Sequence, residues 1–195
     1  QPDAYASGHL PGAVFVDMNA ALAAPAGPDT GRHPLPEPSV FAEQMADALR
    51  RSDAPPPVVV YSNSIQAGNG TAYGDAKARA ADVLASAADE LGLTFIDLRL
   101  PNLFGEHGRP FYTAVTATFC HILAEGGWPK VESDKALTLL HAQNAADLLI
   151  GNVPLEDQAG LEVRETVSGL LERLASFARV YRTGEIPDIA AAFDR

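Results

Sequence analysis

The clearest hydrophobic pattern in the chain is a strand–helix–strand series in its middle. Residues 58–61 read Val-Val-Val-Tyr, which is typical of a strand buried on both faces, as in a parallel sheet. Residues 73–91 are rich in Ala and charged side chains and predict a long helix, which Gly92 ends. The next strand is predicted at 93–98, and Pro101 marks its end.

The pattern continues as alternating helices and strands toward the C-terminus. It predicts helices at 114–125, 142–150 and 163–181 and a short strand at 136–140. Strands that alternate with helices are typical of an α/β fold. We therefore expect a mostly parallel sheet flanked by helices.

The first third of the chain is interrupted by Pro and Gly. Residues 24–38 contain so many of them that an irregular surface loop is expected. Before this loop, residues 13–16 are a strand candidate. After it, residues 39–51 have helical spacing and follow a plausible helix start at Pro38 and Ser39. A charged, proline-rich break is predicted at 52–57.

Composition narrows the possible functions. The 195 residues are 47% hydrophobic, which suits one or two compact domains, and the net charge of -11 argues against nucleic-acid binding. A phosphorylated small molecule is not excluded, because a pocket can be locally positive. The single Cys120, with neither a signal peptide nor an apolar membrane span, favours a cytoplasmic protein. His121 and His141 have no partners at metal-ligand spacing, so we expect no metal site.

Three residues of the central segment suggest acid–base chemistry. Tyr73 and Lys77 are four residues apart, so both project from one face near the helix start, and the preceding strand delivers Ser64 to the same place. An ammonium group and a helix N-terminus both favour a phenolate, which can exchange a proton with a substrate oxygen. Ser64 would hydrogen-bond that oxygen. The alternative is a surface Tyr–Lys pair beside a capping serine.

The surroundings of these residues resemble one enzyme family. Ser-Ile-Gln-Ala at 64–67, Tyr-Gly-x-x-Lys at 73–77 and Arg-Leu-Pro-Asn-Leu-Phe-Gly at 99–105 occur in the order seen in the extended short-chain dehydrogenase/reductases. This family is also called the NAD-dependent epimerase/dehydratase family. Within it, residues 58–193 are most similar to capsular-polysaccharide nucleotide-sugar 4-keto reductases. The resemblance implies a Rossmann-like fold.

The resemblance also implies a set of site residues and ligands. It implies Ser64, Tyr73 and Lys77 as catalytic residues; Tyr73, Lys77, Pro101, Asn102 and Leu103 as cofactor-binding residues; and Gln66, Asn102, Arg109 and Tyr112 as substrate-binding residues. The expected cofactor is NAD or NADP, and the expected substrate is a nucleotide sugar with a 4-keto or 4-hydroxy deoxysugar. Family members are commonly homodimers. For Arg109, a solvated loop position is an equally good interpretation.

The chain departs from this family in its first part. The Gly-rich turn that holds the cofactor pyrophosphate does not precede Val58. Residues 3–61 instead resemble part of a rhodanese or mercaptopyruvate sulfurtransferase domain. Sulfur transfer needs a cysteine directly after the central strand, and this chain has Ser-Asn-Ser at 62–64. We therefore expect a rhodanese-like segment at 1–57 and a dehydrogenase-like half at 58–195.

These observations lead to one expected function and two alternatives. We expect an NAD(P)-dependent oxidoreductase or epimerase that acts on a nucleotide sugar. The first alternative is a composite or truncated domain that is catalytically inactive and binds no cofactor. The second is a rhodanese-like binding module without the catalytic cysteine.

Overall fold

The computed structural model describes residues 2–9, 13–28, 34, 36–51, 58–186 and 188. The chain forms two compact units, residues 1–99 and residues 100–195, and each is described by itself. The break predicted at 52–57 lies outside the described residues, as does Pro187 in the C-terminal segment used for the family likeness. Leu10, Pro11 and Gly12 of the rhodanese-like motif also lie outside them.

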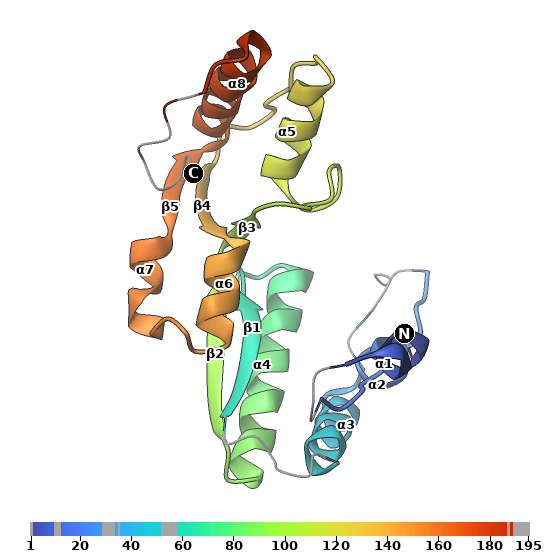
Figure 1. The fold of residues 1–195 in the computed structure, drawn as a ribbon. Coiled ribbons are helices and arrows are strands. Elements are labelled where there is room, and N and C mark those ends of the chain that lie inside the picture. The colour runs from blue at the N-terminus through green and yellow to red at the C-terminus, as the bar shows by residue number, and fades with distance from the viewer. Residues whose placement is uncertain are drawn as a thin grey trace. The chain divides into compact units, whose positions relative to one another are not determined.

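The first unit is built around a strand–helix–strand core (Figure 1). Its elements are α1 (Pro2–Ser7), α2 (Met18–Ala21), α3 (Pro38–Arg50), β1 (Val58–Ser64), α4 (Ala72–Glu90) and β2 (Thr94–Leu100). Strands β1 and β2 are neighbours in a two-stranded sheet. Helix α4 packs against β1 on one side and contacts α3. Its buried side is mostly alanine, which allows close approach to both neighbours.

The prediction of a strand at residues 13–16 is wrong. Residues 13–17 are described, and they have no regular secondary structure. The backbone carbonyl of Ala13 instead accepts a hydrogen bond from the Tyr5 hydroxyl, and the Phe15 ring lies 5.4 Å from the Tyr5 ring. A sequence of β-branched and aromatic residues forms a strand only when a neighbouring strand provides hydrogen-bond partners for its backbone N–H and C=O groups.

The second unit contains a three-stranded sheet in the order β3-β4-β5. Its elements are β3 (Asn102–Phe104), α5 (Val115–Ala124), β4 (Ala136–His141), α6 (Ala142–Leu149), the 3-10 helix η1 (Leu155–Asp157), α7 (Gln158–Leu161), β5 (Val163–Thr166) and α8 (Val167–Thr183). Strands β3 and β4 are parallel, with Leu103 opposite Leu140. Strands β4 and β5 are antiparallel, with Leu139 opposite Val163.

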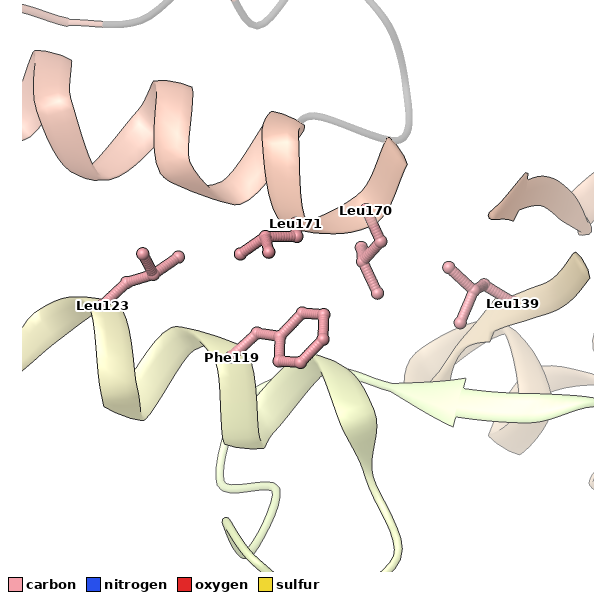
Figure 2. Close-up of a cluster of buried hydrophobic side chains, with 5 residues drawn as sticks. All are labelled: Phe119, Leu123, Leu139, Leu170 and Leu171. Atoms are coloured by element: carbon pink, nitrogen blue, oxygen red, sulfur yellow. The ribbon is translucent and has the colours of Figure 1, made fainter. Parts of the chain in front are cut away.

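A cluster of apolar side chains joins the helices of this unit to its sheet. Figure 2 shows Phe119 and Leu123 of α5 facing Leu170 and Leu171 of α8, with Leu139 of β4 at one end. Leu139 and Leu170 are each only 1% exposed. Because large aliphatic side chains contribute most when fully removed from water, this cluster is an apolar core that stabilises the second unit.

The start of the helix predicted at 163–181 is also wrong. Residues 163–166 form β5, and α8 begins only at Val167. The Thr166 hydroxyl caps α8 by accepting a hydrogen bond from the Gly169 backbone N–H at 3.0 Å. The antiparallel pairing with β4 therefore determines the conformation of these four residues.

The remaining predicted helices and strands are confirmed to within three residues at each end. The predicted α/β class, with a parallel strand pair and flanking helices, is confirmed as well. Short elements that the pattern did not predict are α1, α2, β3, η1 and α7. Among the described residues, no helix is both long and apolar enough to cross a membrane.

Candidate active site at the end of β1 and the start of α4

A tight loop brings the end of β1 to the first turn of α4. The Thr71 hydroxyl accepts a hydrogen bond from the Gly74 N–H at 3.0 Å, and Asn69 Oδ1 accepts one from the Thr71 hydroxyl at 2.6 Å. A Cβ atom at Gly74 would lie 2.3 Å from the Gln66 carbonyl oxygen and 2.2 Å from Asn69 Oδ1. Glycine in the Tyr-Gly-x-x-Lys motif is therefore required by the close approach of this loop.

The predicted catalytic residues all lie in this strand–loop–helix segment. Tyr73 is in the first turn of α4 and is 53% exposed. Lys77 is one turn further along, and its Nζ donates a hydrogen bond to the Ser62 carbonyl at 3.0 Å. Ser64 ends β1, and its Oγ accepts a hydrogen bond from the Gln66 N–H at 3.2 Å.

The segment brings these three side chains to one region without joining them directly. In the part of the chain that the structure describes, no hydrogen bond links Ser64, Tyr73 and Lys77 to one another. The Lys77 ammonium instead lies over the ring of Tyr61, 4.9 Å from its centroid. Tyr61 is also close enough to Tyr73 for their charges to interact. Tyr61 is therefore a member of the site that the sequence pattern did not identify.

A polar pair made of the buried Asn63 and the partly buried Asp97 lies beside this group. Asn63 is only 4% exposed, and its side-chain amide donates a hydrogen bond to Asp97 Oδ1 at 2.6 Å. The Asn63 side-chain oxygen accepts a hydrogen bond from the Ser64 N–H at 2.8 Å. Asp97 Oδ2 lies 3.0 Å from Nε of Arg99. The sequence signal for this pair was a carboxylate between apolar residues of one strand and an amide at the end of the other.

Burial and nearby charges shift the pKa values of Tyr61 and Lys77. Burial raises the pKa of Tyr61 to about 12, and the nearby Tyr73 and Asp97 act in the same direction. Tyr61 therefore keeps its proton at neutral pH. Burial also lowers the pKa of the Lys77 ammonium, while the negative charge of Asp97 opposes this effect.

The predicted cofactor-flanking residues that follow β2 belong to the second unit. Pro101 is buried and directly precedes β3 in the sequence. The Asn102 side-chain amide donates a hydrogen bond to the Thr138 carbonyl at 3.1 Å, which ties β3 to β4. Leu103 is 41% exposed. Asn102 thus has a structural contact, and Leu103 presents apolar surface to solvent.

The predicted substrate contacts Arg109 and Tyr112 lie on a loop of the same unit. The guanidinium carbon of Arg109 is 5.4 Å from the centroid of the Tyr112 ring, and Tyr112 is 69% exposed. Their neighbour Phe111 is 67% exposed and has a positive φ of 56°. The Phe111 N–H donates a hydrogen bond to the Thr118 hydroxyl at 2.9 Å, which holds the loop to α5. Gln66, in contrast, is an exposed loop residue of the first unit.

Comparison with solved structures extends over most of the chain. The capsular polysaccharide assembling protein CapF from Staphylococcus aureus matches 79% of this chain with a TM-score of 0.68 and 26% sequence identity. The chain resembles the extended short-chain dehydrogenase/reductases. UDP-glucose 4-epimerase from Thermotoga maritima matches 73% of the chain with a TM-score of 0.56 and 16% identity, which supports the fold alone.

Comparison with curated proteins finds shorter matches to two families. The chain is 36% identical over 77 residues to the UDP-2-acetamido-2,6-beta-L-arabino-hexul-4-ose reductase of Pseudomonas aeruginosa. It is 40% identical over 76 residues to SseB of Mycobacterium tuberculosis, which is named as a candidate thiosulfate sulfurtransferase. No family model matches the chain. Both resemblances predicted from the sequence are thus confirmed.

Each of these matches covers only part of the other protein. The chain spans 20% of the reductase and 26% of SseB. It spans 45% of the CapF chain and 52% of the epimerase chain. Each likeness is therefore to a portion of a longer protein.

Proposed function

We propose that this chain carries the catalytic strand–loop–helix of a nucleotide-sugar oxidoreductase of the short-chain dehydrogenase/reductase type. The observation that supports this most is the placement of Ser64, Tyr73 and Lys77. They lie at the end of one strand and in the first turns of the helix that follows it. The similarity to a UDP-sugar 4-keto reductase and to CapF supports the choice of substrate class.

In this proposal, Tyr73 exchanges a proton with the oxygen at C4 of the sugar. During reduction, the phenol donates its proton as the carbonyl carbon becomes a secondary alcohol, and the exposed Tyr73 regains a proton from solvent. The Ser64 oxygen already accepts a hydrogen bond from the Gln66 N–H. This contact leaves the Ser64 O–H to donate to the same substrate oxygen and hold it in place.

The residues present fit one part of an NAD(P) molecule. An ammonium group has three N–H donors, and the Ser62 carbonyl accepts one from Lys77. The other donors of Lys77 are suited to the hydroxyls of a ribose. NADH or NADPH would supply the hydride to the carbonyl carbon when bound, and would leave as NAD or NADP. A Gly-rich turn does not precede Val58 in this sequence, so contacts to the pyrophosphate are not part of the proposal.

Cofactor binding tests the proposal most directly. We expect NADH or NADPH to show a saturable change in nicotinamide fluorescence on titration with the protein. Lys77→Ala should weaken this binding by about tenfold or more, because it removes charge-assisted hydrogen bonds. The matched control is Lys130→Ala, because the Lys130 side chain is 84% exposed and forms an exposed ion pair with Glu132 at 3.7 Å. Absence of binding to either nucleotide, or equal losses in the two variants, would contradict the proposal.

A second proposal concerns where the rhodanese-like segment ends and the dehydrogenase-like segment begins. We infer a rhodanese-like segment at 1–57 and a dehydrogenase-like segment at 58–195. The join then falls inside the first compact unit, where α3 from one segment packs against α4 from the other. A catalytically inactive composite is the alternative function, and it is supported by the likeness of this one chain to both a reductase and a sulfurtransferase. The fluorescence titration separates the two, because the inactive composite would bind no nucleotide.

A further inference from the structure

A groove lies in the second unit between the end of α5 and the neighbouring helix α8. These two helices pack side by side (Figure 1). The groove has a volume of about 630 Å³, and it is lined by α8, by the end of α5 and by the turn that follows α5. None of the residues predicted for catalysis, cofactor binding or substrate binding lines it. Its chemistry therefore needs an explanation of its own.

Three residues, here called the floor, give the groove an apolar surface. Ala175 and Ala178 of α8 line the groove and pack against the apolar cluster of this unit. Leu123 of α5 lines it as well and is only 5% exposed. The methyl side chains of the two alanines leave open the space that longer side chains would fill. The floor can therefore take up an apolar group and remove it from water.

A glycine turn after α5 brings an aromatic ring to the groove. The Gly126 N–H donates a hydrogen bond to the Leu123 carbonyl at 3.1 Å, and the Gly127 N–H donates one to the Ile122 carbonyl at 2.9 Å. Gly126 has a φ of 84°, a conformation that favours glycine at the end of a helix. Trp128 follows directly, lines the groove and is 69% exposed. Its ring offers a flat apolar surface beside the floor.

Two arginines of α8 also line the groove. Arg182 donates a hydrogen bond through Nη2 to the Leu123 carbonyl, which holds its guanidinium group at the end of α5. Arg179 precedes it by three residues and lines the same groove. In the part of the chain that the structure describes, neither arginine forms an ion pair with a carboxylate. Because a guanidinium group has five N–H donors, both arginines keep donors for a ligand.

The charge and the size of the groove indicate the kind of ligand. Glu172 is the carboxylate that lines the groove together with the two arginines, so the lining has a net positive charge. This is the opposite of the whole chain, whose net charge is -11. An anion is therefore complementary to the groove. The volume lies within the range of about 300–1,000 Å³ that is typical of small-molecule sites, which favours a small molecule over a folded protein.

We propose that the groove between α5 and α8 binds a small organic anion with an aromatic body. The anionic group binds Arg179 and Arg182, because a planar guanidinium group matches the geometry of carboxylates, sulfonates and phosphates. The aromatic body packs on the Trp128 ring and on the floor. The groove shares no residue with the proposed catalytic segment of the first unit, so binding here does not depend on the oxidoreductase function.

Two fluorescent dyes that differ in charge test the site. Anilinonaphthalene sulfonate carries a sulfonate, and phenylnaphthylamine has the same aromatic body without it. We expect the anionic dye to bind saturably and to change the emission of Trp128, which is the only tryptophan in the sequence. Arg179→Gln should weaken its binding by about fivefold, and Glu172→Gln should strengthen it by about twofold, as for partly exposed ion pairs. Neither variant should change the binding of the neutral dye.

Opposite effects of Arg179→Gln and Glu172→Gln on the anionic dye are the result that supports the proposal. A loss of folded structure would change dye binding in the same direction in both variants. Arg164→Gln is the matched control, because it removes an exposed arginine of β5 outside the groove and should leave dye binding unchanged. Trp128→Ala should weaken the binding of both dyes, because it removes the aromatic surface.

Three outcomes would overturn the proposal. The first is an equal loss of binding in Arg179→Gln and Arg164→Gln, which would show attraction by overall charge alone. The second is binding of the neutral dye that is as tight as binding of the anionic one. The third is an unchanged emission of Trp128 at saturation, which would place the dye elsewhere. The replaced side chains are all exposed, so we expect each variant to fold, and circular dichroism checks this.

Discussion

The Nζ atom of Lys77 lies 4.9 Å from the centroid of the Tyr61 ring. This is the geometry of a cation–π contact, which is stronger when the ammonium is partly removed from water. Tyr61 is suited to it, because burial keeps its hydroxyl protonated and its ring neutral. The site therefore has two tyrosines with different environments: Tyr61 packs under the ammonium, and Tyr73 is exposed to solvent.

This difference predicts different effects for two conservative substitutions. Tyr73→Phe removes the proposed proton donor, and we expect the rate of NADPH-dependent reduction of a UDP-linked 4-keto sugar to fall by roughly 10²–10⁴-fold. Tyr61→Phe keeps the ring under Lys77, and we expect it to retain most of the activity. The decrease in NADPH absorbance measures both rates. Equal losses of activity in the two variants would contradict the assignment of the acid–base role to Tyr73.

The loop before α4 predicts a stability effect at Gly74. Gly74→Ala places a Cβ atom 2.3 Å from the Gln66 carbonyl oxygen, so the backbone must shift. We expect the free energy of unfolding to fall by roughly 1–3 kcal/mol, as for overpacked sites. Urea unfolding followed by circular dichroism measures the change. Gly8→Ala is the control in the same unit, because a Cβ there meets nothing within 4 Å and should cost far less.

The start of α8 predicts a pH-dependent contribution to stability. The Asp134 carboxylate accepts hydrogen bonds from the Ser168 N–H at 2.9 Å and the Ser168 hydroxyl at 2.7 Å. These bonds, the backbone one foremost, lower the pKa of Asp134 from its ordinary value of 3.8. A lowered folded-state pKa stabilises the protein above the unfolded-state value, and this stabilisation is lost as the pH falls through the folded-state value.

Asp134→Ala should therefore lower the melting temperature of the protein at neutral pH. The difference from wild type should shrink as the pH falls below about 4, where the unfolded-state carboxyl takes up its proton. Thermal unfolding at several pH values measures the change. Glu132→Ala, which removes only an exposed contact with Lys130, should show little difference at any pH. A constant difference across the pH range would contradict the assignment.

Much of the fold was predictable because the relevant signals are local. The composition of residues 73–91 favours a helix, and α4 is found at Ala72–Glu90. The pattern failed where conformation depends on a distant partner. Residues 163–166 were predicted to start the helix, because their sequence pattern resembles that of the helix after them. They instead form a strand that pairs with β4.

The amino-acid sequence by itself determined that Tyr73 and Lys77 share one face of α4, since a helix places residues four apart on one face. It also suggested the roles that we propose for these two residues and for Ser64. Only the tertiary structure decided what surrounds Lys77. Asn63 and Asp97 are 34 residues apart and meet because β1 and β2 are neighbours in the sheet. Strand pairing of this kind depends on the whole unit, so a local pattern of polar and apolar residues does not encode it.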